Sequence, residues 1–400
     1  MGTTVRLLSL ASPRDLMQEF GRIGVDRGGR RIMLPKGAWR CFKVSRLPSF
    51  CANILKQEML ALGAEAAVSR GALTGGAQLT DCILLGNLAQ FDGLLRKLKR
   101  QPLGLAGLGA ELRRALAACA RMDRALALAG RTFALGRRTW LMGVVNATPD
   151  SFSGDGLAGR PVAEIAARIE SMVRDGADII DIGGESSRPG ARPVSARVER
   201  ARVIPLLKAI RRRVRVPVSV DTVKSEVARA ALDSGACVIN DISALRHDKK
   251  MAGVVARGKA AVVLMHMQGT PRTMQKAAHY RDVLQEVTDF LRGAIRRALD
   301  AGIAEDRIIV DPGIGFGKTF EHNIEILRRL PEFGVFGRPV CVGLSRKSFI
   351  GRLTGKRPEE RGWGTASAVA HAAARGADIL RVHDIGAIRQ VLKVSDALTK

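Results

Sequence analysis

The chain has 400 residues, 46% of them hydrophobic, which is enough for two globular domains, one large and one of common size. Its net charge of +27 favours an anionic ligand, but only 4% of residues are aromatic and Tyr280 is the sole tyrosine, so no stacking platform for single-stranded nucleic acid is expected. The longest apolar runs are too short to span a membrane, and the N-terminal segment lacks the apolar core of a secretory signal. Six cysteines without CxxC or metal-ligand spacing favour reduced thiols in the cytoplasm.

Residues 1–130 read as a small α+β domain with alternating and helical patterns. The expected strands cover 5–10, 41–47, 66–69 and 82–86, and the expected helices cover 15–24, 50–64, 91–100 and 108–130. The segment 71–78 is rich in glycine and reads as a turn-rich break. No catalytic constellation is found here, so we interpret residues 1–130 as a packing, dimerising or regulatory domain.

Residues 131–400 repeat one unit, an apolar strand followed by a helical segment, after a short hairpin at 133–140. The eight expected strands cover 141–146, 177–182, 216–221, 236–242, 260–266, 307–312, 339–345 and 377–384. Strands this apolar, alternating with helices, indicate a parallel sheet that is covered on both faces. Eight units in this length, with no GxGxxG after the first strand, predict an α/β fold of the (β/α)8 barrel type over about 133–400.

Polar residues cluster at the C-terminal ends of these strands, which converge at one mouth of a barrel. They are Asn146, Asp181, Asp221, Asn240, Asp241, His266, Asp311, Ser345, Arg346, Lys347, Arg381, His383 and Asp384. A single aspartate at a strand end is more often a helix cap or loop anchor, but all eight strands share this feature. Lys318 does not belong to a phosphate-binding loop, because Pro312 stands where that motif needs glycine. We interpret His266 as a packing residue at the mouth.

Several segments resemble one family. They are NATPDSFS (146–153), GGESSRPGA (183–191), SVDT (219–222), NDI (240–242), MHMQGTP (265–271), DPGIGFGKT (311–319), GLSRKSFIG (343–351) and RVHD (381–384). Together and in this order they resemble dihydropteroate synthase over about residues 133–400. The resemblance implies a cytoplasmic, homodimeric transferase of folate biosynthesis and a target of sulfonamides. It would condense 6-hydroxymethyl-7,8-dihydropterin diphosphate with p-aminobenzoate, giving 7,8-dihydropteroate and pyrophosphate.

The resemblance also implies the site residues. Asp221, Asn240, Asp311 and Lys347 would bind the pterin, and Asn146, Arg188, Arg381 and His383 would bind the diphosphate, with Mg²⁺ held at Asn146. Ser187, Arg188, Pro189, Phe316 and Ser348 would bind p-aminobenzoate, with Pro149 and Phe152 as further candidates. The catalytic set would be Asp221, Asp311, Lys347, Arg381 and His383. No residue serves as covalent nucleophile, so we expect an SN1-like cleavage of the C–O bond, with the pocket stabilising the leaving diphosphate.

Two other functions were weighed. A pterin-binding methyltransferase shares the barrel and the Asp and Asn residues that bind the edge of a pterin. Its reaction, however, does not require the segments SRKSFIG (345–351) and RVHD. A basic, non-enzymatic role in nucleic-acid binding is supported by the net charge alone. That role predicts a degraded set of strand-end residues, whereas the set in this sequence is complete.

Overall fold

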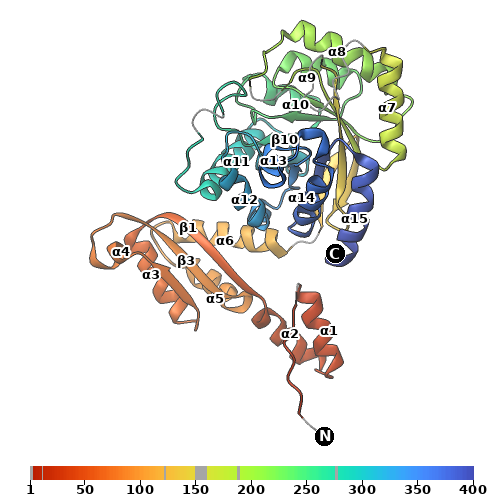
Figure 1. Cartoon of the computed structure of the whole chain (residues 1–400). Helices are drawn as coiled ribbons and strands as arrows, with labels where there is room; N and C mark the ends of the chain where they lie inside the picture. Colours follow the sequence, from red (N-terminus) through yellow and green to blue (C-terminus); the bar gives the residue numbers. More distant parts are fainter. Residues whose placement is uncertain (1–2, 11, 121–122, 149–159, 187–189, 275–277) are drawn as a thin grey trace. The chain divides into compact units, whose positions relative to one another are not determined.

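The computed structural model describes residues 3–10, 12–120, 123–148, 160–186, 190–274 and 278–400. The chain folds into two compact units, Met1–Leu116 and Ala117–Lys400, which are coloured along the sequence in Figure 1. Among the described residues, no helix has both the length and the apolar content to cross a lipid bilayer.

The first unit is an α+β arrangement around a three-stranded antiparallel sheet in the order β1-β3-β2. Its elements are α1 (Pro13–Arg22), α2 (Arg27–Gly37), β1 (Trp39–Pro48), α3 (Ser49–Leu60), β2 (Glu65–Val68), α4 (Arg70–Thr74), β3 (Leu79–Asn87), α5 (Leu88–Leu98) and α6 (Leu105–Ala120). Alternate residues of β3 are buried against the helices, where Leu55, Phe91 and Leu94 are fully enclosed.

Three expectations for this region were wrong. Residues 5–10 form no strand, and Val5 and Leu7 are almost fully exposed, because an alternating pattern without a partner strand gains no ladder of hydrogen bonds. The segment 71–78 begins within the short helix α4, whose first turn is capped by Ser69. The helix expected to reach residue 130 ends with α6, and Arg124–Leu128 is instead a strand, β4.

The second unit begins its sheet structure with a two-stranded hairpin, β4 (Arg124–Leu128) and β5 (Arg131–Leu135). Its two-residue turn places Ala129 at φ 49° and Gly130 at φ 77°, the left-handed pair that matches the twist of a tight hairpin. Pairing with β5 thus overrides the helical preference of the alanine-rich sequence. The hairpin lies wholly in the second unit.

Eight parallel strands form the main sheet, which confirms the predicted barrel. They are β6 (Trp140–Asn146), β7 (Ile179–Gly183), β8 (Val218–Asp221), β9 (Val238–Asp241), β10 (Ala261–Met265), β11 (Ile308–Asp311), β12 (Cys341–Gly343) and β13 (Ile379–Val382). The order is β11-β10-β9-β8-β7-β6-β13-β12, and a parallel bridge between Val310 and Val340 joins the two ends. The sheet therefore closes on itself.

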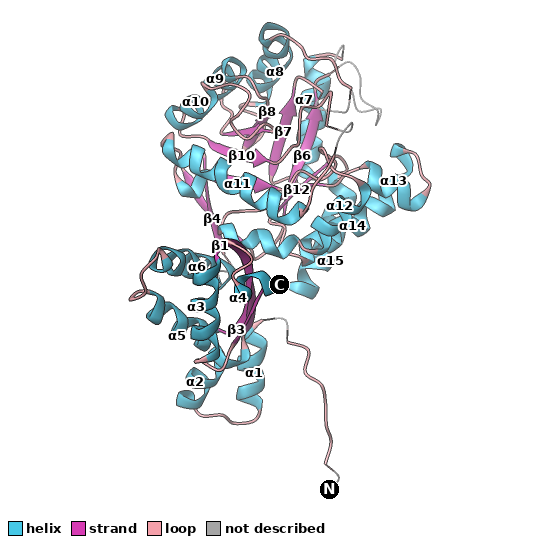
Figure 2. Cartoon of the chain, turned by 90° about the vertical axis from the view of Figure 1, so that its left-hand side faces the viewer, coloured by secondary structure: helices cyan, strands magenta, loops and turns pink. Residues whose placement is uncertain are grey.

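Helices surround this sheet, as Figure 2 shows. They are α7 (Val162–Arg174), α8 (Ala196–Ile210), α9 (Ser225–Asp233), α10 (Met251–Arg257), α11 (Val283–Asp300), α12 (Phe320–Arg328), α13 (Ser348–Thr354), α14 (Gly362–Ala374) and α15 (Ile385–Thr399), with the 3-10 segments η1 (Glu305–Arg307), η2 (Leu330–Phe336) and η3 (Pro358–Glu360). The predicted helix-ending glycines, 176, 235, 302 and 376, all have positive φ.

The hairpin closes the end of the barrel opposite the mouth. Leu126, Leu128 and Leu135 are at most 1% exposed and pack with the inward-facing residues near the starts of the strands, such as Met142 and Ile309. The ring of Phe133 meets Trp140 edge to face at 5.1 Å. The hairpin thus fills the barrel interior at this end, and the polar groups lie at the mouth, the opposite end.

We expect Leu126→Ala to lower the free energy of unfolding of the barrel by about 2–5 kcal/mol, because it opens a cavity in this packed plug. Urea unfolding followed by far-ultraviolet circular dichroism measures the change. Thr132→Ala, an exposed position on the same hairpin, is the control and should change stability by less than about 0.5 kcal/mol. Equal effects of the two changes would show that the hairpin is not part of the core.

Candidate active site at the barrel mouth

A half-buried arginine joins three strands at the mouth. Arg381, on β13, donates from Nε to Asp181 Oδ2 at 2.7 Å and from Nη2 to Asp221 Oδ2 at 3.0 Å. Asn240, on β9, donates to the same Asp181 oxygen at 3.1 Å. Two of these bonds join a guanidinium to a carboxylate, a strong and directional pairing. The four side chains therefore hold one another in fixed orientations.

Burial disfavours ionisation of two carboxylates at the mouth, Asp221 and Asp311. Desolvation raises the pKa of Asp221 to about 7, although the Arg381 charge opposes it. Desolvation likewise raises the pKa of Asp311 to about 6, opposed by the Gly313 N–H and by the charges of Lys347, Lys318 and Arg381. Gly313 N donates to Asp311 Oδ1 at 2.7 Å, so Oδ2 is the oxygen placed to accept from a ligand.

All four residues assigned to the pterin line one small cavity. Asp221, Asn240, Asp311, Lys347 and Arg381 line it together with apolar or glycine positions, Ile242, Met265, Gly313, Ile314, Phe316 and Gly343. Its volume is about 20 Å³, close to that of one water molecule. Lys347 Nζ lies 4.3 Å from the centre of the Phe316 ring at this cavity, so its flexible chain must shift to admit a heterocycle.

The turn that carries Lys347 is held in an unusual backbone conformation. Arg346 has φ 59°, in the left-handed region that a side chain disfavours. Arg361 donates to the carbonyl of Arg346 at 2.9 Å, Thr365 accepts from the Arg346 N–H at 3.2 Å, and Asp384 pairs with its guanidinium. These contacts stabilise the turn and set the direction of Lys347.

The remaining described candidates lie at the rim. His383 Nδ1 is 2.9 Å from Ser345 Oγ, which joins the ends of β12 and β13. Ser348 is exposed at the first position of α13, and Asn146 is half-buried as the last residue of β6. The predictions for Ser187, Arg188 and Pro189, and those for Pro149 and Phe152, fall outside the residues that the structure describes.

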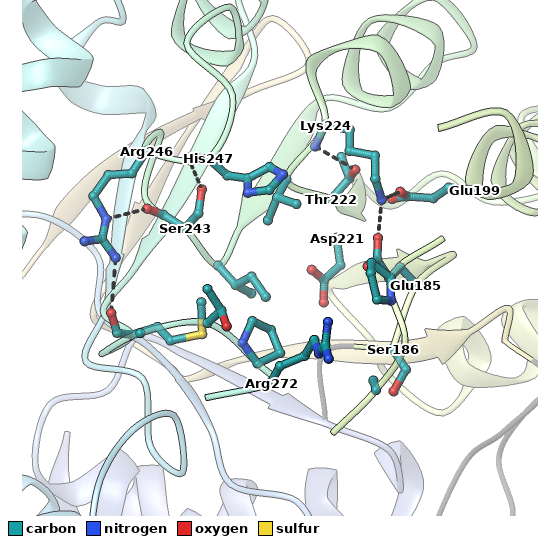
Figure 3. Close-up of a pocket in the computed structure, with 18 residues that line it drawn as sticks. Glu185, Ser186, Glu199, Asp221, Thr222, Lys224, Ser243, Arg246, His247 and Arg272 are labelled. Carbon is teal, nitrogen blue, oxygen red and sulfur yellow. Dashed lines mark hydrogen bonds and ion pairs between the residues drawn. The ribbon is translucent and has the colours of Figure 1, made fainter. Parts of the chain in front are cut away.

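A wider cleft of about 440 Å³ lies beside Asp221, and Figure 3 shows its lining. At one side of the cleft Lys224 pairs with two carboxylates, Glu185 and Glu199, the latter completely buried on α8. The ammonium therefore joins the loops that follow β7 and β8. The sequence analysis placed Asp181 at the barrel mouth but assigned it no role, and it did not predict the cluster of Lys224, Glu185 and Glu199.

The loop after β11 follows the predicted tight turn. Gly313, Gly315 and Gly317 have φ values of 70°, 82° and 63°. A side chain at Gly313 would meet the carbonyl oxygen of His266 at 1.9 Å, so only glycine allows this approach. His266 is buried and its ring meets Phe290 edge to face, as a packing residue does, but it also bonds to Lys318.

Comparison with known proteins identifies the family. The family model described as pterin binding enzyme matches residues 142–383. A dihydropteroate synthase of Synechocystis is 46% identical over 267 residues, covering 66% of this chain and 92% of that protein. A Xanthomonas albilineans dihydropteroate synthase, solved in complex with 7,8-dihydropteroate, has 40% identity and a TM-score of 0.60 over 69% of this chain and 98% of that one.

The chain belongs to the dihydropteroate synthase family. This membership confirms the predicted barrel and the predicted function as a transferase of folate biosynthesis. The N-terminal unit also has a counterpart within the family. A probable bifunctional folylpolyglutamate synthase/dihydropteroate synthase of Halobacterium salinarum is 42% identical over 389 residues, covering 97% of this chain and 46% of that protein.

The raised pKa of Asp221 gives the dihydropteroate synthase barrel a definite pH dependence. The folded protein holds a proton at Asp221 up to about pH 7, whereas the unfolded chain releases it near its usual value of 3.8. Between these values the folded state binds more protons, so the contribution of Asp221 to stability falls as the pH rises from about 4 to about 7.

We therefore expect the melting temperature of Asp221→Asn to depend less on pH than that of the wild type between pH 5 and 7.5. Differential scanning calorimetry across this range measures the two slopes. Asparagine has no charge to desolvate, so the two proteins should differ most near pH 7.5, and the difference in slope is the decisive quantity. Parallel slopes would mean that Asp221 is already ionised at pH 5.

Proposed function

We propose that this chain condenses 6-hydroxymethyl-7,8-dihydropterin diphosphate with p-aminobenzoate and releases pyrophosphate. The observation that carries the proposal is the single cavity in which Asp221, Asn240, Asp311, Lys347 and Arg381 meet. Acceptors and cations alternate around this cavity, as a heterocycle with a 2-amino group, ring N–H groups and a carbonyl requires. The family membership and the dihydropteroate complex of the Xanthomonas relative support the same reaction.

In this proposal Asp311 accepts from the 2-amino group and the neighbouring ring N–H of the pterin. Its carboxylate is held by the Gly313 N–H, and ligand binding must overcome the burial that favours its protonated form. Asp221 and Asn240 meet the other polar edge, oriented by the network of Arg381 and Asp181. Lys347 swings from the Phe316 ring to the pterin or its diphosphate.

The bond that breaks joins the pterin methylene to the diphosphate oxygen. We propose a dissociative, SN1-like step, because an electron-rich dihydropterin spreads positive charge from that carbon and the site offers cations to the leaving group. Arg381 is bound through Nε and Nη2 to carboxylates, so Nη1 is the group it would offer to the diphosphate, together with His383. Arg188, outside the described residues, is proposed as a further cation for the diphosphate. The amine of p-aminobenzoate then attacks, with its ring against Phe316 and its carboxylate at Ser348.

Mg²⁺ fits this site as a companion of the substrate. The described residues contain no group of three His, Cys, Asp or Glu side chains that could hold a metal alone. Asn146 offers one amide oxygen at the end of β6, and magnesium accepts few protein ligands when phosphates and waters complete its shell. When bound, it would neutralise charge on the departing diphosphate.

The test is pyrophosphate release by the purified chain, supplied with the dihydropterin diphosphate, p-aminobenzoate and Mg²⁺, each omitted in turn. Release that requires all three supports the proposed reaction and the metal. Release without p-aminobenzoate would mean simple hydrolysis, and pterin binding without release would point to a different reaction at the same site.

Lys347→Ala should reduce turnover by at least about 100-fold while leaving the melting temperature within a few degrees, because it removes the one mobile ammonium at the cavity. Steady-state pyrophosphate release measures the loss. Lys356→Ala, an exposed lysine beyond α13, is the matched control and should be fully active. Normal activity of Lys347→Ala would remove this lysine from the mechanism.

We further propose a cytoplasmic homodimer. The six cysteines, all in the described part of the chain, form no disulfide with one another, which suits a reducing compartment. Helices α12, α13 and α14 form an apolar groove of about 690 Å³, lined by Phe320, Ile324, Leu327, Phe349, Ile350 and Leu353 among others. Leu353 at its edge is 63% exposed and Trp363 nearby on α14 is 90% exposed. An exposed apolar face of this kind suits a self-complementary contact with a second copy.

Leu353→Asp should convert the dimer to a monomer, since it places a charge within the apolar contact. Size-exclusion chromatography with light scattering measures the mass. Lys356→Asp, a charge reversal on the exposed segment just after α13, should remain dimeric. A wild-type chain that is monomeric at micromolar concentration would refute the dimer directly.

A further inference from the structure

Lys318 is an almost completely buried lysine behind the active site. Its side chain is 3% exposed, and Nζ lies 2.9 Å from the carbonyl oxygen of Gly313, 3.1 Å from that of Phe316 and 2.8 Å from Nδ1 of His266. An ammonium has three N–H groups, and these three near acceptors, with the His266 carbonyl farther off at 3.5 Å, can engage all of them. His266 Nδ1 must therefore accept, which places the ring proton on Nε2.

Both carbonyls belong to the turn that presents the ligand-binding groups. Gly313 donates its N–H to Asp311, and Phe316 carries the ring beneath Lys347. The turn is pressed against the end of β10, since a side chain at Gly317 would lie 2.8 Å from the backbone oxygen of Gln268. Lys318 thus fastens the turn to β10 from inside, without lining the cavity itself.

We propose that Lys318, supported by His266, is a positioning residue for the reaction: it fixes the turn 313–316 and supplies the positive charge that keeps Asp311 ionised for the pterin. The inference rests on the proposed function, because it takes Asp311 as the acceptor of the pterin N–H groups. Burying a lysine is costly even when its N–H groups find acceptors, so a charge kept at this position is expected to serve more than packing.

The charges around both groups support this role. Asp311 faces Lys318, Lys347 and Arg381, with the Cys341 thiol beside it on β12. Lys318 faces Asp311, Lys347 and the neutral His266, which in turn faces Arg246 and Tyr280. Burial lowers the pKa of Lys318 to about 7, so near pH 6, where Asp311 titrates, the ammonium still carries its charge.

The sign of the effect follows. Removing the Lys318 charge leaves Asp311 with fewer cations, so the pKa of Asp311 rises further above its usual range. A pterin that needs the carboxylate form then binds poorly up to a higher pH. The acidic limb of kcat/KM for the dihydropterin diphosphate should move upward by about one pH unit, a tenfold loss on the acidic side of the limb.

The experiment compares Lys318→Gln with Lys318→Arg. Glutamine keeps two N–H donors for the carbonyls but has no charge, whereas arginine keeps the charge. We expect the shifted limb in Lys318→Gln and a limb at the wild-type pH in Lys318→Arg, measured by pyrophosphate release and, independently, by calorimetric binding of the dihydropterin diphosphate. Lys318→Met is the second neutral replacement, for use if the glutamine variant does not fold.

A lower melting temperature with an unmoved limb would reduce Lys318 to a structural residue and overturn the proposal. A shift of equal size in the arginine variant would also overturn it, because charge would then not be the cause. An inactive wild type that still binds the pterin would refute the proposed reaction while the binding measurements still test Lys318.

Discussion

The mouth of the barrel depends on the ionic network around Arg381. One guanidinium, donating to Asp181 and Asp221, ties β13 to β7 and β8, and Asn240 adds β9 through the shared Asp181 oxygen. Taking these charges out of water is unfavourable, and only good geometry with several hydrogen bonds offsets it. The network therefore requires the rigid frame of the closed eight-stranded sheet. Its hydrogen bonds in turn fix the side chains that line the cavity.

The charged side chains of the site have different partners, and these differences determine the chemistry of the site. Asp181 and Asp221 share one arginine, whereas Asp311 is served by backbone N–H and by two lysines in different roles. Lys347 is half-exposed beside the Phe316 ring, whereas Lys318 is enclosed and hydrogen-bonded to the turn. One lysine thus lies at the cavity and the other behind it.

Sequence patterns predicted the barrel well because its strands are short apolar runs separated by helical repeats and glycine stops. They also predicted Asp221, Asn240, Asp311, Lys347 and Arg381 as neighbours, since the ends of parallel strands converge. They placed Asp181 at the mouth but could not show that it pairs with Arg381. Lys318 was examined only as a motif residue, because nothing in the sequence reveals that a lysine points inward. The strand predicted at 5–10 does not form, and the residues of β4 were predicted as helix. Both predictions were wrong because strand formation depends on a partner strand that the local sequence does not contain.

The left-handed backbone at Arg346 has a consequence for how this enzyme can change. A conformation of this kind raises the free energy of the folded state by about 1–3 kcal/mol, and glycine at the same position would relieve it. The same exchange would remove the ionic contact with Asp384 and loosen the turn that directs Lys347. Selection for heat resistance alone would therefore favour glycine at 346, and selection for turnover would favour arginine. Stability and activity are in direct competition at this one residue.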